Sequence, residues 1–452
     1  MIYKENEMNI KAFSTDRFGV CRERDVFTTT ENTTGSLTVN IFNEAVQNDF
    51  QGFGVALTGS SCYLLNKMTR EKRETLLEDI YGIDGLGLSV ARISIGASDY
   101  SPEIYSYEDS NGNFTIEKDE EYVLPVLQEV AKKYKDVRFY ASPWSPPGRM
   151  KTGGSMCGGF MREGFIDEYV QYIINFVRAY KEKGIPLWAI TPQNEPETDQ
   201  GGKMPACYWS PETEAKFALS LRKKAEELGL PFEIWLCDHN FSHWKRVLWQ
   251  LQEFPDLEKA VSAVAFHYYN GGVDLIENLR RVYPALEFHF SEGGPRLYDN
   301  YATDHCKWGL AITRALNHGC KSFTGWNLLL DETGNPNVGP FFCGGLVTEN
   351  SITGELSYSG QYQAFKHFSP YVKRGAKILR TEILGKDNGL FRYPNVKISL
   401  EVCAAKNVDG GIVIQVVNPD VNEKRQMSLI YNGKKIYFEA LQNSVNTILI
   451  ED

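Results

Sequence analysis

The chain has 452 residues, and its 48 Lys and Arg against 58 Asp and Glu give a formal net charge of −10. Hydrophobic residues make up 42% and charged residues 23%, which is typical of a folded globular protein and not of a disordered one. The acidic balance, without a basic run, disfavours nucleic acid or an anionic membrane as a partner. No apolar run reaches the roughly 18 residues of a membrane-spanning helix, so we expect no membrane insertion. The N-terminal sequence shows no secretion signal, which predicts a cytoplasmic protein.

Cysteine usage argues against two further classes. Nine cysteines are scattered singly along the chain, and no Cys-x-x-Cys occurs. An odd number without paired spacing disfavours both a disulfide framework and a zinc ribbon.

Eight candidate strands alternate with helical patterns through the middle of the chain. The strands are expected at 52–58, 88–96, 137–144, 187–195, 232–240, 263–269, 287–294 and 321–331. Apolar residues at three- and four-residue spacing predict helices at 70–81, 120–134 and 164–184. Ser210 followed by Pro211 predicts the start of another helix. This number of βα units favours a (β/α)₈ barrel over a doubly wound sheet.

Both ends of the chain have strand patterns without helices. Residues 10–48 are rich in Thr, Val and Ile, and strands are expected at 396–405, 411–419, 426–432, 434–441 and 445–450. We therefore expect a β-sandwich built from both ends and attached to the barrel. The expected division is 1–50 for the N-terminal strands, 51–375 for the barrel and 376–452 for the C-terminal sandwich.

Carboxylic acids end two of the predicted barrel strands. Glu195 ends the fourth strand and Glu292 ends the seventh, with Trp and Tyr residues at neighbouring strand ends. The carboxyl ends of barrel strands build the active site, and strands four and seven face each other across the ring. One acid that protonates a leaving oxygen and one carboxylate that faces the anomeric carbon are the requirements of glycoside cleavage.

An ordered set of motifs points to one family. The set is GFGVALTGSSCYLL, RISIGASDYS, ASPWSPPGRMKTGGSM, AITPQNEP, HYY, SEGG, WNLLLDETGNPN and HFSPYVKRGAKIL. Together these motifs resemble glycoside hydrolase family 30, which includes lysosomal glucosylceramidase, β-glucosidases, β-xylosidases and β-1,6-glucanases. The resemblance covers most of the chain, in the right order.

The resemblance implies a role for each matched residue. Glu195 would be the general acid/base and Glu292 the nucleophile of a retaining reaction, with the two carboxyl groups about 5–5.5 Å apart. Asn194 would bond the sugar 2-hydroxyl, while Arg92 and Tyr269 would hold Glu292. The pocket for the non-reducing sugar would be lined by Trp144, Trp326 and Asn337.

Two positions depart from the family pattern. Gly59 stands where many relatives have an aspartate that binds hydroxyls on the far side of the sugar, so a weaker preference for glucose is expected. Arg149 stands where relatives usually have Trp. At the pocket mouth it could bind a polar or acidic group of the substrate, or point to solvent.

Two other patterns have been considered as sites. Asp238, His239 and His243 invite a metal site, but the sequence has no His-Glu-x-x-His, and the two histidines fall in different predicted elements. We therefore expect no metal, and expect His239 to be hydrogen-bonded or to contact substrate. The sequence GFGVALTG lacks the third glycine of a nucleotide-binding loop.

The sequence thus predicts a retaining exo-β-glycosidase that needs no cofactor. Its expected substrate is a small β-glucoside, β-xyloside or β-fucoside, or an oligosaccharide with such an end. An endo-β-1,6-glucanase with an open cleft is the first alternative, and a sugar-binding barrel without catalysis is the second. Loops 196–209 and 295–305 are expected to set the depth of the pocket.

Overall fold

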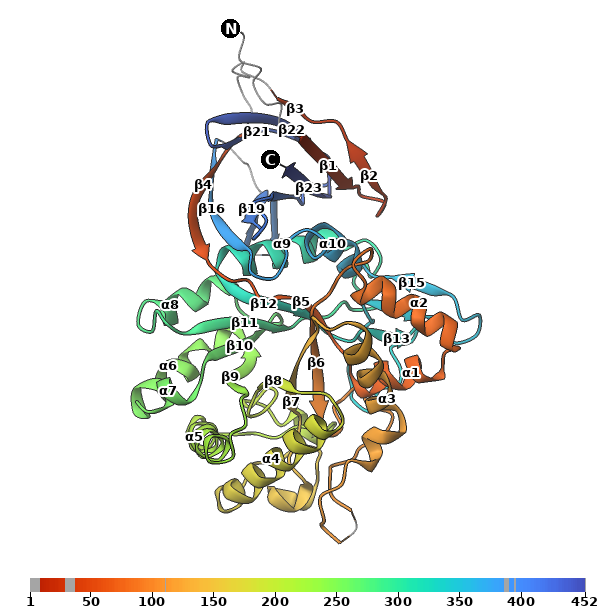
Figure 1. Cartoon of the computed structure of the whole chain (residues 1–452), viewed down its shortest axis with the longest axis vertical. Helices are drawn as coiled ribbons and strands as arrows, with labels where there is room; N and C mark the ends of the chain where they lie inside the picture. The colour runs from red at the N-terminus through yellow and green to blue at the C-terminus, as the bar shows by residue number, and fades with distance from the viewer. Residues whose placement is uncertain (1–8, 29–36, 110, 386–389, 394–395, 452) are drawn as a thin grey trace. The chain divides into compact units, whose positions relative to one another are not determined.

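A computed structural model describes residues 9–28, 37–109, 111–385, 390–393 and 396–451 (Figure 1). The chain forms two compact units. One consists of Phe53–Tyr298 and Ser322–Ser357, and the other of Met1–Gly52, Asp299–Lys321 and Tyr358–Asp452. The sequence-based division placed 299–321 and 358–375 with the barrel, whereas these residues cluster here with the terminal strands.

The predicted barrel is confirmed. Eight parallel strands close into a ring; seven lie within a stretch predicted from the sequence, and β12 begins one residue before its predicted stretch. They are β5 (Gly52–Ala56), β6 (Val90–Ile95), β7 (Arg138–Pro143), β8 (Leu187–Ile190), β9 (Glu233–Asn240), β10 (Ala263–His267), β11 (Glu287–Glu292) and β12 (Cys320–Gly325). Buried aromatic side chains such as Tyr140 and Trp235 fill the interior, so the ring is a packed core rather than a pore.

Amphipathic helices follow the strands, as the periodicity predicts. Helix α4 buries nine residues at three- and four-residue spacing. Helix α5 begins after Ser210, whose hydroxyl accepts a hydrogen bond of 3.0 Å from the Thr213 amide, with Pro211 in the first turn. The helices between β5 and β11 are α1 (Gly59–Lys67), α2 (Arg70–Tyr81), α3 (Glu117–Lys133), α4 (Ile166–Glu182), α5 (Pro211–Glu227), α6 (Trp244–Glu253), α7 (Leu257–Ala260) and α8 (Glu277–Arg280). A small sheet of β13 (Leu329–Asp331), β14 (Val347–Glu349) and β15 (Leu356–Tyr358) follows the last barrel strand.

The second unit is the predicted sandwich of N- and C-terminal strands, formed as one curled, mostly antiparallel sheet (Figure 1). In sheet order the strands are β2 (Cys21–Arg24), β1 (Asn9–Thr15), β23 (Ser444–Glu451), β20 (Ile412–Asn418), β19 (Glu401–Lys406), β16 (Lys377–Leu384), β4 (Leu37–Gln47), β21 (Arg425–Tyr431), β22 (Lys434–Ala440) and β3 (Phe27–Thr28). Alternate side chains of these strands form one apolar core, which includes Val39, Ile414 and Met427. The helices α9 (His305–Asn317) and α10 (Gly360–Phe368) pack against β23. β17 (Leu390–Tyr393) and β18 (Val396–Ile398) pair separately.

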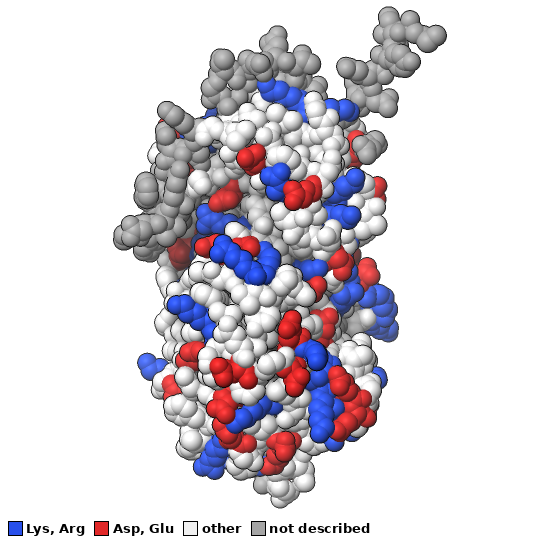
Figure 2. Space-filling view, turned by 90° about the vertical axis from the view of Figure 1, so that its left-hand side faces the viewer, with Lys and Arg blue, Asp and Glu red and all other residues white. Residues whose placement is uncertain are grey.

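Two further features concern the surface charge and the helices of the described chain. Acidic and basic side chains are interspersed over the face shown in Figure 2, without a large field of one sign. In the part of the chain that the structure describes, no helix combines the length and the apolar character needed to cross a membrane.

Candidate active site

Arg92 lies at the centre of a buried polar cluster at the carboxyl ends of the barrel strands. Its guanidinium on β6 donates to Glu292 at the end of β11, to Asn194 Oδ1 at 2.9 Å and to Asp238 Oδ2 at 2.8 Å. The side chain is fully buried, so its charge is stable only because carboxylates surround it. The phenol of Tyr269 donates to the other oxygen of Glu292 at 3.0 Å. The structure therefore brings together four of the predicted site residues.

Two irregularities in strand pairing shape this cluster. Between β9 and β10 the register skips Asp238, and between β10 and β11 it skips Ser291. Each skipped residue is one extra residue at the rim of the barrel, which redirects a side chain. Cys237 and Asp238 also have positive φ angles of 74° and 45°, a rare backbone conformation for residues other than glycine. The two extra residues bond each other, with Ser291 Oγ donating to Asp238 Oδ1 at 2.8 Å.

The Asp238 carboxylate collects donors from around the ring. Besides Arg92 and Ser291 it accepts hydrogen bonds from Ser142, Thr191 and His267, at 2.7, 2.7 and 3.0 Å. Burial favours the neutral acid, but the charge of Arg92 and the hydrogen bond from His267 outweigh it and lower the pKa of Asp238. Asp238 is therefore a buried anion that fixes its neighbours.

His267, the last residue of β10, links the two predicted catalytic carboxyl groups. Its Nδ1 lies 3.1 Å from Glu195 Oε1, and its Nε2 lies 3.7 Å from Glu292 Oε2. Burial disfavours the cation, yet the charge of Glu292 and the hydrogen bonds to Asp238 and Glu195 raise the pKa of His267 to about 10. At neutral pH the ring thus carries two protons, one on the side of Glu195 and one on the side of Asp238.

Glu195 sits just beyond β8 with a positive φ of 49°, and its amide donates to the Asp238 carbonyl at 3.0 Å. Its side chain is 16% exposed. The second carboxyl oxygen accepts from Gln200 Nε2 at 2.9 Å. Burial favours the protonated acid, but the hydrogen bond and charge of His267 lower the pKa of Glu195. In the unliganded site the proton therefore rests on His267.

Aromatic rings lie beside this cluster. Trp144 and Trp326 stack with ring centroids 5.2 Å apart, and the Arg92 guanidinium lies 4.9 and 5.4 Å from the two rings. Such contacts stabilise a buried cation. Each indole is only 2% exposed, so these residues form a wall with little free surface. Asn194 keeps its Nδ2 group without a partner among the described residues.

The other predicted site residues have different surroundings. Asn337 uses its amide within its own loop, donating to the Phe341 carbonyl at 2.5 Å and accepting from the Gly339 amide at 2.6 Å. A Cβ at Gly59 would lie 3.0 Å from Ser101 Oγ, so the neighbouring segment occupies space that an aspartate would need.

Arg149 does not present a free cation to the substrate. It forms ion pairs with Glu168 and, at 2.7 Å, with Glu108. These ion pairs disfavour the expectation that Arg149 binds an acidic group of the substrate, because two carboxylates from other parts of the chain already pair with it. The sequence could not show this, since Glu108 is 41 residues away.

His239 is buried and neutral. Its Nδ1 lies 3.8 Å from Glu195 Oε1, and its ring stacks on His243 at 4.0 Å. Burial lowers the pKa of His239 to about 3. With Glu195 and His267 it forms a group whose candidate ligand atoms lie within 4.8 Å of one another. Both nitrogens of His267 already face carboxylates, so a metal ion there would have to displace a proton.

Three residues of this cluster received no catalytic or substrate-binding role from the sequence, although Asp238 was considered as part of a metal site. His267 and Asp238 end strands six and five, a position that is itself a signal for site residues in a barrel. Asp99, in the loop after β6, is 5% exposed, and its Oδ1 has no partner among the described residues. Burial and the charges of Glu292 and Glu195 raise the pKa of Asp99 well above its ordinary range, although backbone amides of Tyr100 and Asp99 bond the carboxyl group. The Oδ1 atom of this acid is therefore available to a ligand.

Comparison with known proteins identifies the family. Residues 50–372 match the model of the glycosyl hydrolase family 30 TIM-barrel domain. The chain belongs to glycosyl hydrolase family 30. As a member of this family it is a retaining hydrolase of O-glycosidic bonds, and its substrate is a carbohydrate.

Glucosylceramidase and endo-1,6-β-glucanase are two names that recur among the similar proteins. An endo-1,6-β-D-glucanase of Neurospora crassa is 27% identical, with 85% of this chain and 82% of that protein covered. Putative glucosylceramidase 3 of Caenorhabditis elegans is 28% identical, with 78% and 73% covered. The structure of the endo-β1,6-glucanase BT3312 superposes with a TM-score of 0.86 at 25% identity and covers 98% of this chain and 99% of that one.

The predicted exo-acting β-glycosidase is wrong. The endo-1,6-glucanases match along nearly the whole chain, in sequence and in structure, and support the alternative reading instead. The physical reason is that the matched motifs describe the strand ends that carry Glu195 and Glu292, and these strand ends do not determine the mode of attack. The loops around the site decide the mode of attack, and their shape cannot be read from motifs.

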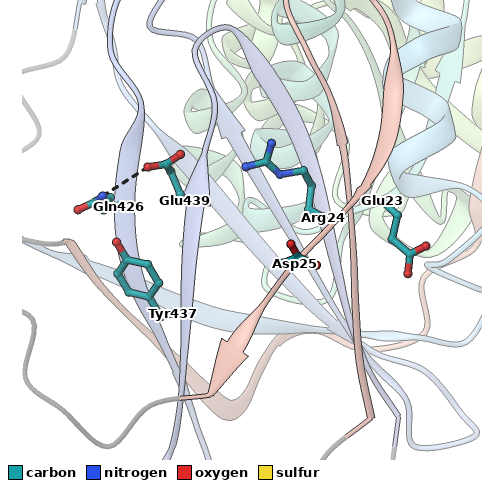
Figure 3. Close-up of a pocket in the computed structure, with 6 residues that line it drawn as sticks. All are labelled: Glu23, Arg24, Asp25, Gln426, Tyr437 and Glu439. Atoms are coloured by element: carbon teal, nitrogen blue, oxygen red, sulfur yellow. Dashed lines mark hydrogen bonds between the residues drawn. The ribbon is translucent and has the colours of Figure 1, made fainter.

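A separate pocket lies on the curled sheet. It has a volume of about 530 Å³ and is lined by Glu23, Arg24, Asp25, Gln426, Tyr437 and Glu439 (Figure 3). Gln426 and Glu439 face each other across β21 and β22 and form a hydrogen bond of 3.4 Å. The pocket contains none of the predicted site residues.

Proposed function

We propose that this family 30 hydrolase is an endo-β-1,6-glucanase, with Glu195 as acid/base and Glu292 as nucleophile. One observation carries the assignment of roles: a single imidazole, His267, contacts both carboxyl groups at the carboxyl ends of the barrel strands. The names of the similar proteins, which match over nearly the whole chain, supply the substrate. Cytoplasmic location, expected from the N-terminal sequence, stays a prediction.

The first step needs a proton on Glu195. When glucan enters and water leaves, the proton on His267 Nδ1 passes to Glu195 Oε1, and from there to the glycosidic oxygen. The carboxylate of Glu292 attacks the anomeric carbon, the bond to the leaving O6 breaks, and that oxygen departs as a hydroxyl. Arg92 and Tyr269 hold Glu292 ionised and aimed during the attack.

The second step restores the site. The ester on Glu292 has lost its negative charge, and Glu195, now a carboxylate, takes a proton from water. The resulting hydroxide attacks the anomeric carbon and frees Glu292, and the proton taken from water then passes from Glu195 back to His267 Nδ1. Asn194 Nδ2 and the protonated Asp99 bond sugar hydroxyls in both steps, which stabilises the oxocarbenium-like transition state.

The decisive experiment is the product profile on linear β-1,6-glucan. An endo-enzyme lowers the mean chain length early and releases oligosaccharides before glucose. Chromatography of products at less than about 5% conversion measures this. Glu292→Gln should reduce kcat by about 10⁴-fold or more while the melting temperature stays close to that of the wild type. Glucose as the sole early product, or full activity in Glu292→Gln, would contradict the proposal.

A further inference from the structure

The loop that follows the nucleophile forms a short antiparallel ladder with a second loop. The Gly344 amide donates to the Pro295 carbonyl at 2.9 Å, the Leu297 amide donates to the Phe342 carbonyl at 3.4 Å, and Arg296 pairs with Cys343. Because side chains alternate along an extended segment, Arg296 and Tyr298 lie on the same face of this ladder. Arg296 follows Glu292 by only four residues in the sequence.

Arg296 is a half-buried cation without a carboxylate partner in the described chain. Its guanidinium instead lies between two tyrosine rings, 5.4 Å from the centre of Tyr269 and 6.0 Å from that of Tyr298. A guanidinium offers five N–H donors in a rigid plane. Arg149, by contrast, has two carboxylate partners. Arg296 therefore has donors to offer to hydroxyl groups of a ligand.

The outer ring of this face is open to solvent. Tyr298 is 69% exposed, an unusual position for a large aromatic side chain. Tyr and Trp rings at such positions offer an apolar face for stacking and a polar edge for hydrogen bonds. The apolar face of a pyranose ring can stack on the ring of Tyr298, and the equatorial hydroxyls of the sugar can accept hydrogen bonds from Arg296.

The face is continuous with the reacting centre. Arg296 contacts the ring of Tyr269, and the hydroxyl of Tyr269 donates to Glu292 at 3.0 Å. A chain of contacts thus leads from the exposed Tyr298 to the nucleophile. A sugar bound at Arg296 and Tyr298 would lie next to the sugar that Glu292 attacks.

We propose that Arg296 and Tyr298 form a second glucose-binding subsite, which holds the neighbouring unit of a β-1,6-glucan chain. The inference rests on the proposed function and deepens it, because an enzyme that cuts inside a chain must bind units on either side of the broken bond. Tyr298 stacks on the pyranose ring, and Arg296 donates to its hydroxyls.

The test uses β-1,6-linked gluco-oligosaccharides of two to five units with the full-length enzyme. Tyr298→Ala should raise KM for the longer oligosaccharides by about three- to tenfold, with kcat within about twofold of the wild type. Tyr298→Phe, which keeps the ring, should restore KM. Arg296→Gln should raise KM in the same direction. Trp249→Ala, an exposed aromatic on α6, is the matched control and should change neither constant.

The outcomes separate this inference from the proposed function. If the wild type cuts the oligosaccharides and Tyr298→Ala leaves every KM unchanged, the subsite is refuted and the endo-glucanase stands. If the wild type cuts none of them, the proposed function fails first. Tyr298→Ala decides the matter even if Arg296→Gln does not fold, since the Tyr298 side chain is mostly in solvent. As a second measurement, Glu292→Gln should bind the pentasaccharide more tightly than the double variant with Tyr298→Ala, and equal affinities would also refute the subsite.

Discussion

Protonation of the site depends on a pair of residues rather than on Glu195 alone. His267 faces Glu195, Glu292 and Asp238, and the charged or titratable groups around it also include Arg92, His239 and Tyr269. Glu195 and His267 therefore titrate as a coupled pair, and the protonation state of Glu195 depends on that of His267.

Replacing His267 should move the pH profile of the enzyme. In the wild type the pair keeps its proton up to about pH 10, because the folded pKa of His267 is raised to about 10. In His267→Gln only Glu195 can hold that proton, so the basic limb of kcat/KM should shift down by several pH units. Activity at pH 7 should fall by about ten- to a hundredfold. His243→Gln, which removes a ring that does not contact Glu195, is the control, and a basic limb left in place by His267→Gln would refute the relay.

The same proton contributes to folding stability. The pKa of His267 is raised in the folded state, so folding binds the proton more tightly than the unfolded chain does. The stabilisation is complete below the unfolded pKa of about 6.5 and is lost as pH rises through about 10. The free energy of unfolding, measured in urea, should therefore decline between pH 6 and pH 10 in the wild type. The decline should be smaller in His267→Gln.

At the scale of single residues, the contacts that the family resemblance implied are present. Arg92 and Tyr269 bond Glu292, the last residue of β11. His267 and Asp238 received no role in this cluster because extra residues in β9 and β11 change which side chains point inward. A strand pattern with period two contains no sign of such an irregularity.

At the scale of elements, the barrel strands were predictable because buried parallel strands are continuous apolar runs flanked by amphipathic helices. The ladder between 295–298 and 341–344 could not be predicted, because its two segments lie far apart in sequence and have no strand pattern. Loops 196–209 and 295–305 were expected to shape the pocket. Only the structure shows that Arg296 and Tyr298 in the second loop share one face with Tyr269.

Close contact between β5 and β6 makes one glycine of the barrel indispensable. A Cβ at Gly54 would lie 2.4 Å from the Val90 carbonyl oxygen, a backbone atom that cannot move alone. Gly54→Ala should therefore destabilise the protein by about 1–3 kcal/mol. Gly164 has open space at its Cβ position and no positive φ, so Gly164→Ala should change the stability by less than about 0.5 kcal/mol. Chemical denaturation of both variants measures this, and equal stabilities would contradict the packing argument.

At the scale of the whole molecule, the cysteines report on folding. All nine are free thiols; Cys21 is exposed, Cys157 is half-exposed and the other seven are buried. Burial raises the pKa of Cys207 and Cys403 to about 12, which removes the reactive thiolate at neutral pH.

Titration with a thiol reagent should consequently separate the cysteines into three classes by their rate of reaction. Cys21 should react fast and Cys157 more slowly, while the remaining seven should react only after unfolding in denaturant. A total below nine in denaturant would reveal a disulfide, and a third reactive thiol in the native protein would show that a buried segment opens. The experiment needs no knowledge of the substrate.

The five donors that meet on Asp238 come from β6, β7, the end of β8, β10 and β11, so one carboxylate ties together the rim of most of the barrel. Evolution or an engineer can therefore exchange the loops beyond this rim without disturbing the reacting groups. The loops that determine the substrate range can therefore vary, while the residues that carry out the chemistry stay fixed. Directed evolution toward a new glycan should accumulate its changes in loops such as 295–298 and avoid the residues bonded to Asp238.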